Sequence, residues 1–432
     1  MQTILRSVHR RPVTPLIAIV AAACVGASDD VAPITSQITE GVPEAHGFAP
    51  EGLATIGPAM QDLIDAGRTA GVMTLVARGG AVVHWEARGW RVLNEQPLER
   101  DDVFRIYSMT KPVTSVAVMM LVEEGKLRLD QPLTDFLPAF ADVQVYDEGD
   151  FRPPSRSITI RDLLRHTSGL TYGIFGNSPV DQMYRSAGNA LGRETGHDLA
   201  ETVDIFATLP LIDDPGKRWN YSVSTDVLGR VVEVASGISL DVFFRKRIFE
   251  PLAMDDTGFH VEPRNLDRFT AVYARRDGEL VMEDSPVDGA FTRPPSWYSG
   301  GGGLTSTAMD YLRFAQMLLN EGELDGQRLL RPETVRDMRS NHLAEEMGPI
   351  SLGAPSHEYG FGLGFAVATA GDQPEHYWWA GVANTWFWID PVEDVIAFAW
   401  TQYSPFGGVP IDPTLRRIVY ESLVESARAP AD

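Results

Sequence analysis

The sequence contains very few cysteines and lysines. Cys24 is the only cysteine among 432 residues, so an intramolecular disulfide and a cysteine-based metal site are excluded. Lysine occurs only at positions 111, 126, 217 and 246. Basic residues are also outnumbered, with 37 Lys and Arg against 59 Asp and Glu and a net charge of −22. A field of that sign repels phosphate backbones, and we therefore predict no nucleic-acid partner.

Several motifs that identify other enzyme classes are missing. No Gly-x-Ser-x-Gly occurs, which excludes the nucleophile elbow of the α/β-hydrolases. The nine histidines show neither His-x-His nor His-Glu-x-x-His spacing, so a metal hydrolase has little support. Four glycines at 300–303 lack the Gly-Lys-Ser/Thr ending of a phosphate loop, and no dinucleotide fingerprint opens a helix. We therefore predict that the protein uses no metal and no cofactor.

The first 27 residues have the order of regions that is typical of an export signal. Arg6, Arg10 and Arg11 precede an apolar stretch that ends at Cys24, and small residues follow it. Such a stretch is too short to span a bilayer as a helix. We favour a signal peptide that is cleaved after residue 27, followed by a polar tether over residues 28–46.

Two other interpretations of this segment stay open. "VAAAC" is similar to a relaxed lipoprotein signal in which Cys24 is acylated, although Ala21 replaces the usual leucine. The segment could also be a disordered N-terminus that is never translocated. We expect an exported protein, periplasmic or secreted, that associates with a membrane only if it is lipid-anchored at Cys24.

Helix and strand patterns occupy both ends of the chain. Residues 49–67 have apolar side chains at helical spacing, and two β-rich runs flank Gly79-Gly80 as in a hairpin. Residues 306–322 show a second amphipathic helix pattern. Two aromatic and β-branched runs, 376–391 and 394–403, precede a closing helix near 411–427.

The middle of the chain has no regular strand rhythm and is interrupted by prolines. The order of patterns predicts an α+β fold, in which one sheet is assembled from both ends of the chain. We expect residues 47–135 and 290–430 to form an α/β domain and residues 136–289 to form an inserted, mostly helical domain.

Ser108 and Lys111 are the most informative pair of residues. Residues three apart lie on one face of a helix, and Pro112 favours a helix start near Ser108, because proline is tolerated in the first turn. The run 113–122 is almost wholly apolar, so the helix should be buried with its N-terminus at a cleft. Burial and the helix dipole both favour a neutral Lys111, which can accept the proton of a serine nucleophile. The plainer alternative is a Ser108 N-cap beside a lysine that reaches the surface.

Ser-x-x-Lys is the nucleophile motif of β-lactamases and penicillin-binding proteins, and further segments match in the same order. The chain resembles the class C β-lactamase-like serine hydrolases over roughly residues 45–428, and among them most nearly the family VIII carboxylesterases. The resemblance implies an antiparallel sheet flanked by helices, with an inserted, mostly helical domain. "RDLLRHTSGLTY" and "WYSGGGGLTSTAMDYLRF" add to the match, and His166 in the first is expected to be structural.

The resemblance implies a role for Tyr221. The sequence "YSV" at 221–223 matches the esterase form of the family's tyrosine motif. Tyr221 is then expected to act as general base once a neighbouring amine lowers its pKa, and later to protonate the leaving alcohol. β-Lactamases and peptidases of the family have Tyr-x-Asn, and Val223 cannot supply that amide.

The third motif of the family is normally Lys-Thr-Gly, and the matching place reads Trp379-Ala380-Gly381. Trp379 removes the cation that pairs with a substrate carboxylate, which favours neutral esters. Gly381 is expected to let a substrate approach closely. By the same resemblance, the backbone N–H groups of Ser108 and Val382 form the oxyanion hole.

Together these features predict a metal-independent serine hydrolase, a carboxylesterase that cleaves short-chain neutral esters through an acyl-enzyme on Ser108. A β-lactamase or D-Ala-D-Ala carboxypeptidase is the first alternative, and an acyltransferase that uses an alcohol acceptor is the second. A non-catalytic binding protein for cell-wall ligands is the least favoured, because Ser108, Lys111 and Tyr221 are all present.

Overall fold

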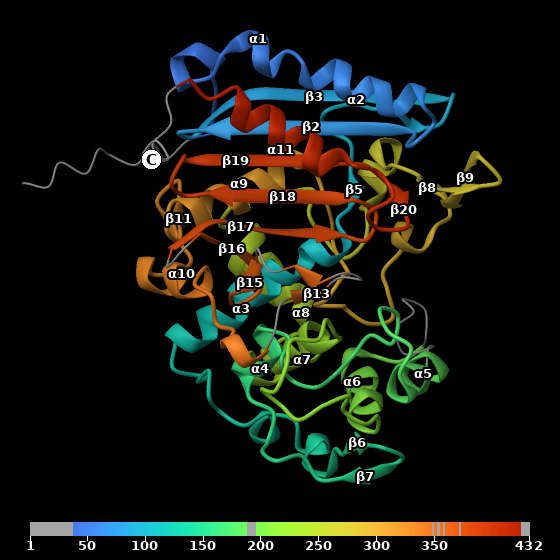
Figure 1. Ribbon diagram of the computed structural model, residues 1–432, viewed down its shortest axis with the longest axis vertical. Helices are drawn as coiled ribbons and strands as arrows, with labels where there is room; N and C mark the ends of the chain where they lie inside the picture. Colours follow the sequence, from blue (N-terminus) through green and yellow to red (C-terminus); the bar gives the residue numbers. More distant parts are fainter. Residues whose placement is uncertain are drawn as a thin grey trace, which may run out of the picture. The chain divides into compact units, whose positions relative to one another are not determined.

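The main sheet combines strands from both ends of the chain (Figure 1). The computed structural model describes residues 38–187, 196–347, 350–351, 355–356, 359–370 and 373–424. Neighbouring strands of this sheet are antiparallel, except that the short strand Thr39–Glu40 runs parallel to the strand Ala81–Val92. Within the described residues the sheet has nine strands, in the order β1 (Thr39–Glu40), β3 (Ala81–Val92), β2 (Gly71–Arg78), β19 (Val395–Trp400), β18 (Thr385–Asp390), β17 (Gln373–Gly381), β16 (Ala366–Ala370) and β15 (Tyr359–Phe361), and β4 (Gln96–Pro97) pairs with β3. The prediction of an α+β fold with one sheet built from both chain ends is confirmed.

The hairpin between β2 and β3 forms where the sequence predicted it. Gly79 and Gly80 have φ values of 60° and 75°, a conformation that glycine adopts at little steric cost. Positive φ at both central residues of a two-residue loop matches the right-handed twist of the flanking strands.

The aromatic and β-branched run 376–391 lies in two strands. β17 ends at Gly381 and β18 begins at Thr385, and Asn384 between them has a φ of 58°. Asparagine tolerates this left-handed conformation better than most residues. The amide side chain of Asn384 also donates to the carbonyl oxygen of Tyr403 at 2.7 Å, which holds the turn in place.

Helices cover both faces of the sheet. Tyr311 of α9 (Ala308–Leu319) packs its ring 5.2 Å from the ring of Phe387 on β18. The guanidinium of Arg416 on α11 (Ile411–Glu421) lies 4.5 Å from the ring of Trp388, the next residue of that strand. Successive side chains of a strand point to opposite faces, so the two helices enclose the sheet. Figure 1 shows α11 in front of the strands and α9 behind them.

The segment between the two halves of the sheet is mostly helical, as predicted. It also contains two β-hairpins that the sequence analysis did not expect. The helices that follow the buried α3 (Thr110–Glu123) are α4 (Ile160–Leu164), α5 (Pro179–Ser186), α6 (Leu199–Ala207), α7 (Ser224–Ser236) and α8 (Leu240–Phe244). The hairpins are β6 (Val145–Asp147) with β7 (Asp150–Arg152), and β8 (Val272–Arg276) with β9 (Glu279–Asp284).

Shorter elements complete the described structure. The helix pattern at 49–67 forms two helices, and α10 follows α9 and the β11–β12 hairpin. Their bounds are α1 (Pro50–Leu53), α2 (Ile56–Asp65), α10 (Pro332–Met338), β5 (Phe104–Arg105), β10 (Thr305–Ser306), β11 (Glu323–Leu324), β12 (Gln327–Arg328), β13 (Ile350–Ser351), β14 (Pro355–Ser356) and β20 (Tyr403–Ser404). The described residues belong to one compact unit, and the predicted domain boundaries within it stay a prediction.

The N-terminal edge of the sheet corrects one expectation. Thr39 and Glu40, which were assigned to a polar tether over residues 28–46, pair in parallel with Ala81 and Val82 of β3. Backbone hydrogen bonds to a strand edge order a polar segment that has little apolar surface to bury. The ordered fold therefore begins before residue 47. The predicted signal segment, Cys24 included, lies outside the described residues.

Candidate active site

Ser108 lies in a tight turn immediately before the buried helix. The α-helix α3 begins at Thr110, two residues later than expected, and a 3₁₀ turn covers Tyr107–Met109. Tyr107 has a φ of 43°, a left-handed conformation that costs a residue with a side chain roughly 1–2 kcal/mol. Such strain persists only where surrounding contacts enforce it. The turn next to Ser108 is therefore held rather than relaxed.

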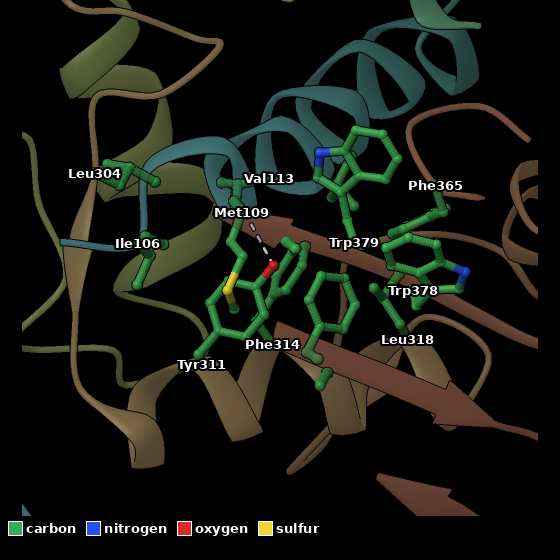
Figure 2. Close-up of a cluster of buried hydrophobic side chains, with 14 of the residues drawn as sticks. Ile106, Met109, Val113, Leu304, Tyr311, Phe314, Leu318, Phe365, Trp378 and Trp379 are labelled. Carbon is green, nitrogen blue, oxygen red and sulfur yellow. Dashed lines mark hydrogen bonds between the residues drawn. The ribbon is translucent and has the colours of Figure 1, made fainter. Parts of the chain in front are cut away.

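Contacts on both sides fix this turn. Arg105, which is fully buried, donates to the carbonyl oxygens of Thr270 and Ser285 and to the carboxylate of Asp284. On the other side, the hydroxyl of Tyr311 donates to the carbonyl oxygen of Met109 at 2.9 Å. Figure 2 shows this bond within a packed apolar cluster that also contains Ile106, Val113 and Trp379. The position of Ser108 is thus set by the protein core.

Lys111 is buried, as the sequence predicted. Its side chain is only 1% exposed, and every residue of α3 from Thr110 to Leu121 is buried. The Nζ atom lies 3.2 Å from Oγ of Ser108, 3.0 Å from Oη of Tyr172 and 2.6 Å from the carbonyl oxygen of Gly301. The alternative in which Lys111 reaches the surface is wrong.

The contacts of Lys111 suit a neutral amine. A neutral amine has two hydrogens and one lone pair, and an ammonium has three hydrogens and none. In the neutral amine, the carbonyl oxygen of Gly301 and Oη of Tyr172 accept the two hydrogens and the lone pair faces the hydroxyl of Ser108. In the ammonium, Oγ of Ser108 accepts the third hydrogen. Burial lowers the pKa of the Lys111 side chain to about 7, and the charge of Asp226 opposes that fall. The pair is arranged for proton transfer from serine to lysine.

Tyr221 lies beside this pair but does not have the expected acidity. Its ring centroid is 4.6 Å from Nζ of Lys111 and 5.2 Å from the ring of Tyr172. Burial raises the pKa of the Tyr221 phenol, and hydrogen bonding with Ser108 only partly opposes the rise. The expectation of a lowered pKa is therefore wrong, because desolvation penalises the phenolate. Tyr221 therefore keeps its proton near neutral pH, and Lys111 is the group that can lose its proton there and accept that of Ser108.

Gly381 brings strand β17 against the Ser108 turn. A Cβ atom at position 381 would overlap the backbone oxygen of Ile106 and the side chain of Thr385. The role predicted for Gly381 was to let a substrate approach closely. The structure shows that its lack of a side chain lets the backbone before Ser108 approach.

A small apolar cleft opens at Ser108. Trp379 is nearly buried, with its ring 5.3 Å from that of Tyr221, and Val382 is 41% exposed. The cleft is lined by Ser108, Phe175, Tyr221, Trp379, Ala380, Gly381, Val382 and Phe406. Among the described residues, those that line the cleft carry no charged side chain. The five site residues expected beside Ser108 therefore lie together, with Lys111 underneath the cleft floor.

His166 matches its expected structural position. Its Nδ1 atom lies 3.1 Å from Oγ of Ser222, and its ring packs 4.9 Å from the ring of Tyr221. Burial holds the pKa of the imidazole well below its usual value. His166 is thus a neutral imidazole that packs against the ring of Tyr221.

Four residues of the site were not predicted from the sequence: Tyr172, Asp226, Phe175 and Phe406. Tyr172 is the last residue of the matched segment "RDLLRHTSGLTY", Phe175 lies three residues further on, and Asp226 lies five residues after Tyr221, so proximity to matched motifs was the available signal. Phe406 follows the cis peptide bond between Ser404 and Pro405. No pattern in the sequence links Phe406 to Ser108.

Comparison with known proteins agrees with this geometry. The sequence model of the family described as Beta-lactamase matches residues 56–421. Esterase EstB of Burkholderia gladioli is 32% identical over 389 residues, which cover 82% of this chain and 91% of that protein. Protein Rv1367c of Mycobacterium tuberculosis is 37% identical over 363 residues, covering 80% and 89% respectively.

A solved structure extends the likeness to the fold. EstCE1, described as a hydrolase with promiscuous acyltransferase activity, superposes with a TM-score of 0.71 at 27% identity, covering 86% of this chain and 99% of its own. Fold and site together define an enzyme of the serine hydrolase type. The chain belongs to the β-lactamase family, within a group of relatives that includes esterases and acyltransferases.

Proposed function

We propose that the protein is a carboxylesterase that cleaves neutral esters with short acyl groups through an acyl-enzyme on Ser108. The observation that supports this most directly is the buried amine of Lys111, 3.2 Å from the Ser108 hydroxyl. A base with a pKa near neutrality at that distance can activate serine without a metal or cofactor.

The proposed reaction has two halves. In the first, Oγ of Ser108 forms a bond to the ester carbonyl carbon while its proton moves to Nζ of Lys111. The backbone N–H groups of Ser108 and Val382 stabilise the resulting oxyanion. The bond to the alcohol oxygen then breaks, and the alcohol leaves with the proton from Lys111, relayed through the phenol of Tyr221.

In the second half, water replaces the alcohol. Lys111 accepts a proton from the water, whose oxygen attacks the acyl carbon and forms a second oxyanion intermediate. The bond to Oγ breaks, Ser108 recovers its proton, and the carboxylic acid leaves. No redox step or additional reactant is needed.

The cleft supports a preference for neutral substrates. Trp379 and Val382 surround Ser108 with apolar surface, and burying a substrate carboxylate there without a cation is costly. Val223 is fully buried at the start of α7 and presents no amide to the cleft. β-Lactam and D-Ala-D-Ala substrates, which have a carboxylate, are therefore disfavoured.

Acyl transfer to an alcohol is the second candidate. EstCE1, whose description includes promiscuous acyltransferase activity, is similar over nearly its full length, and the same acyl-enzyme serves both reactions. Competition between water and a small alcohol, measured as the ratio of acid to new ester formed from one vinyl ester, distinguishes them.

Parallel assays test the substrate class. We expect hydrolysis of p-nitrophenyl butyrate at a kcat/KM far above that for a chromogenic cephalosporin. Equal or greater activity on the cephalosporin would overturn the assignment as an esterase in favour of a β-lactamase.

We also propose export to the periplasm or the medium, on the basis of residues 1–27. Within the described residues, no helix has both the length and the apolar character that a bilayer crossing requires. Intact mass of the mature protein distinguishes the three N-terminal interpretations. Cleavage after residue 27 gives an unmodified shorter chain, acylation leaves a lipid on Cys24, and an untranslocated protein retains residues 1–27.

A further inference from the structure

Asp226 is a buried carboxylate that the proposed reaction does not yet use. It lies in the first turn of α7 and is only 2% exposed. Its Oδ1 atom accepts hydrogen bonds from the hydroxyl of Ser299 at 2.5 Å and from the backbone N–H of Gly301 at 2.9 Å. Burial raises the pKa of the Asp226 carboxyl above its usual value, and the charge of Lys111 together with the donors from Ser299 and Gly301 opposes that rise. A buried charge of this kind needs a partner.

Two bridges connect Asp226 to the amine of Lys111. The backbone of Gly301 is one bridge, because its N–H donates to Asp226 and its carbonyl oxygen accepts from Lys111 at 2.6 Å. The hydroxyl of Tyr172 is the other, lying 3.0 Å from Nζ of Lys111 and donating to Oδ2 of Asp226 at 3.5 Å. Among the described residues, no direct ion pair joins Lys111 to Asp226. The carboxylate is therefore close to the amine but separated from it by one layer of atoms.

Gly301 is required by this arrangement. A Cβ atom at position 301 would overlap the carboxylate of Asp226 and the hydroxyl of Tyr172. The glycine run at 300–303, which matched no phosphate loop, thus has a specific use at its second position. It allows a backbone carbonyl to reach Lys111 between two bulky polar groups.

We infer that Asp226 is a positioning residue for Lys111, and the counter-charge that stabilises the ammonium formed when Ser108 attacks. This inference rests on the proposed function, because it assumes that Lys111 accepts the proton of Ser108. The two bridges orient the amine so that its lone pair faces Ser108. When the proton arrives, the new positive charge lies near a fixed negative one in a site of low dielectric constant.

The other titratable groups around Lys111 do not change charge near neutral pH. His166 is held neutral, since burial keeps the pKa of its imidazole far below the usual value. Burial raises the pKa of the phenols of Tyr172 and Tyr221. Within the described residues, Lys111 and Asp226 are therefore the groups in this cluster whose charges determine how the reactivity of Ser108 falls at acidic pH.

The test is the pH dependence of labelling by a fluorophosphonate, measured as a second-order rate on the full chain. Labelling forms a bond between Oγ of Ser108 and phosphorus, breaks the P–F bond, and leaves the serine proton on Lys111. It requires a neutral amine but no particular ester, so it also reports on a transferase. In the wild type, the labelling rate should fall at acidic pH as Lys111 becomes protonated, and this fall is the acid limb of the profile.

Asp226→Asn removes the charge and keeps the shape and the two acceptor bonds. We expect the acid limb to move to lower pH by about one unit or more, because an opposite charge nearby raises the pKa of an amine. The plateau rate should fall by about tenfold or more, since the ammonium loses its counter-charge. A lower plateau with an unmoved limb would show a merely structural role and would overturn the inference.

Two further variants keep the test decisive. Asp390→Asn is the matched control, because Asp390 is also fully buried and accepts from two backbone N–H groups and a phenol, at the far end of β18. It should leave the limb in place. If Asp226→Asn fails to fold, Tyr172→Phe removes one bridge, and the limb should again move to lower pH. Absence of any label on wild-type Ser108 would instead refute the proposed function.

Discussion

Nζ of Lys111 contacts Oγ of Ser108 at 3.2 Å while being anchored from behind by the carbonyl oxygen of Gly301 at 2.6 Å. The anchor directs one hydrogen of the amine away from the serine. Because α3 is buried from Thr110 to Leu121, Lys111 cannot relax toward solvent, whereas Ser108 faces the cleft.

Replacing Lys111 by methionine should abolish most activity while keeping the fold. Methionine fills a similar volume and burial of the side chain is retained, but no proton acceptor remains. We expect kcat/KM for p-nitrophenyl butyrate to fall by about 10²–10⁴-fold. Lys126→Met is the control, since Lys126 lies just beyond α3, is half exposed and pairs with Glu124. Near-normal turnover in Lys111→Met would contradict the assignment of the base.

Stability should depend on pH through Lys111. Burial lowers its pKa to about 7 in the folded chain, against about 10.4 when unfolded. Between these values the unfolded chain binds more protons, so the free energy of unfolding should rise as pH increases from about 7 to 10. Urea titrations across this range check it, and Lys111→Met should show a flatter dependence. Parallel curves for the two proteins would argue against a neutral Lys111.

Gly381→Ala should disturb both stability and catalysis. The added methyl group meets the backbone oxygen of Ile106, which cannot move without displacing Ser108. Overpacking of this kind costs about 1–3 kcal/mol. Gly302→Ala is the control, because the nearest atoms to a Cβ there lie 3.8 and 4.0 Å away. Thermal melts and esterase assays on both variants measure the difference, and an unaffected Gly381→Ala would refute the close contact.

Phe175 should limit the length of the acyl group. It lines the cleft, is 43% exposed, and packs its ring 5.4 Å from that of Tyr221. Phe175→Ala should raise kcat/KM for p-nitrophenyl octanoate relative to butyrate, because it opens apolar space beside Ser108. Phe151→Ala removes a similarly exposed ring on β7 and should leave the ratio unchanged. An unchanged chain-length profile in Phe175→Ala would place the acyl group elsewhere.

The sequence was sufficient where the relevant spacing is short. Ser108 and Lys111 are three residues apart, and the apolar run that follows Lys111 is continuous, so local periodicity identified both the pair and the burial of the lysine. The assembly of the sheet from both ends of the chain was also predictable, because strand patterns occur at both ends of the sequence.

Long-range contacts were not predictable in the same way. Tyr172 and Gly301 meet Lys111 across 61 and 190 positions, and no local pattern specifies such a pairing. The direction of the pKa shift of Tyr221 was missed for a related reason. Its burial is set by Trp379 and Phe175, which are distant in sequence. The pairing of Thr39 with Ala81 likewise depends on an edge that only the folded sheet provides.

The most direct test of the central claim is intact-mass analysis after incubation with a fluorophosphonate, on wild type and on Ser108→Ala. We predict a mass increase of one phosphonyl group on wild type, assigned to Ser108 by peptide mapping, and none on the variant. Label that persists on Ser108→Ala, or a folded wild type that is never labelled, would contradict Ser108 as the nucleophile.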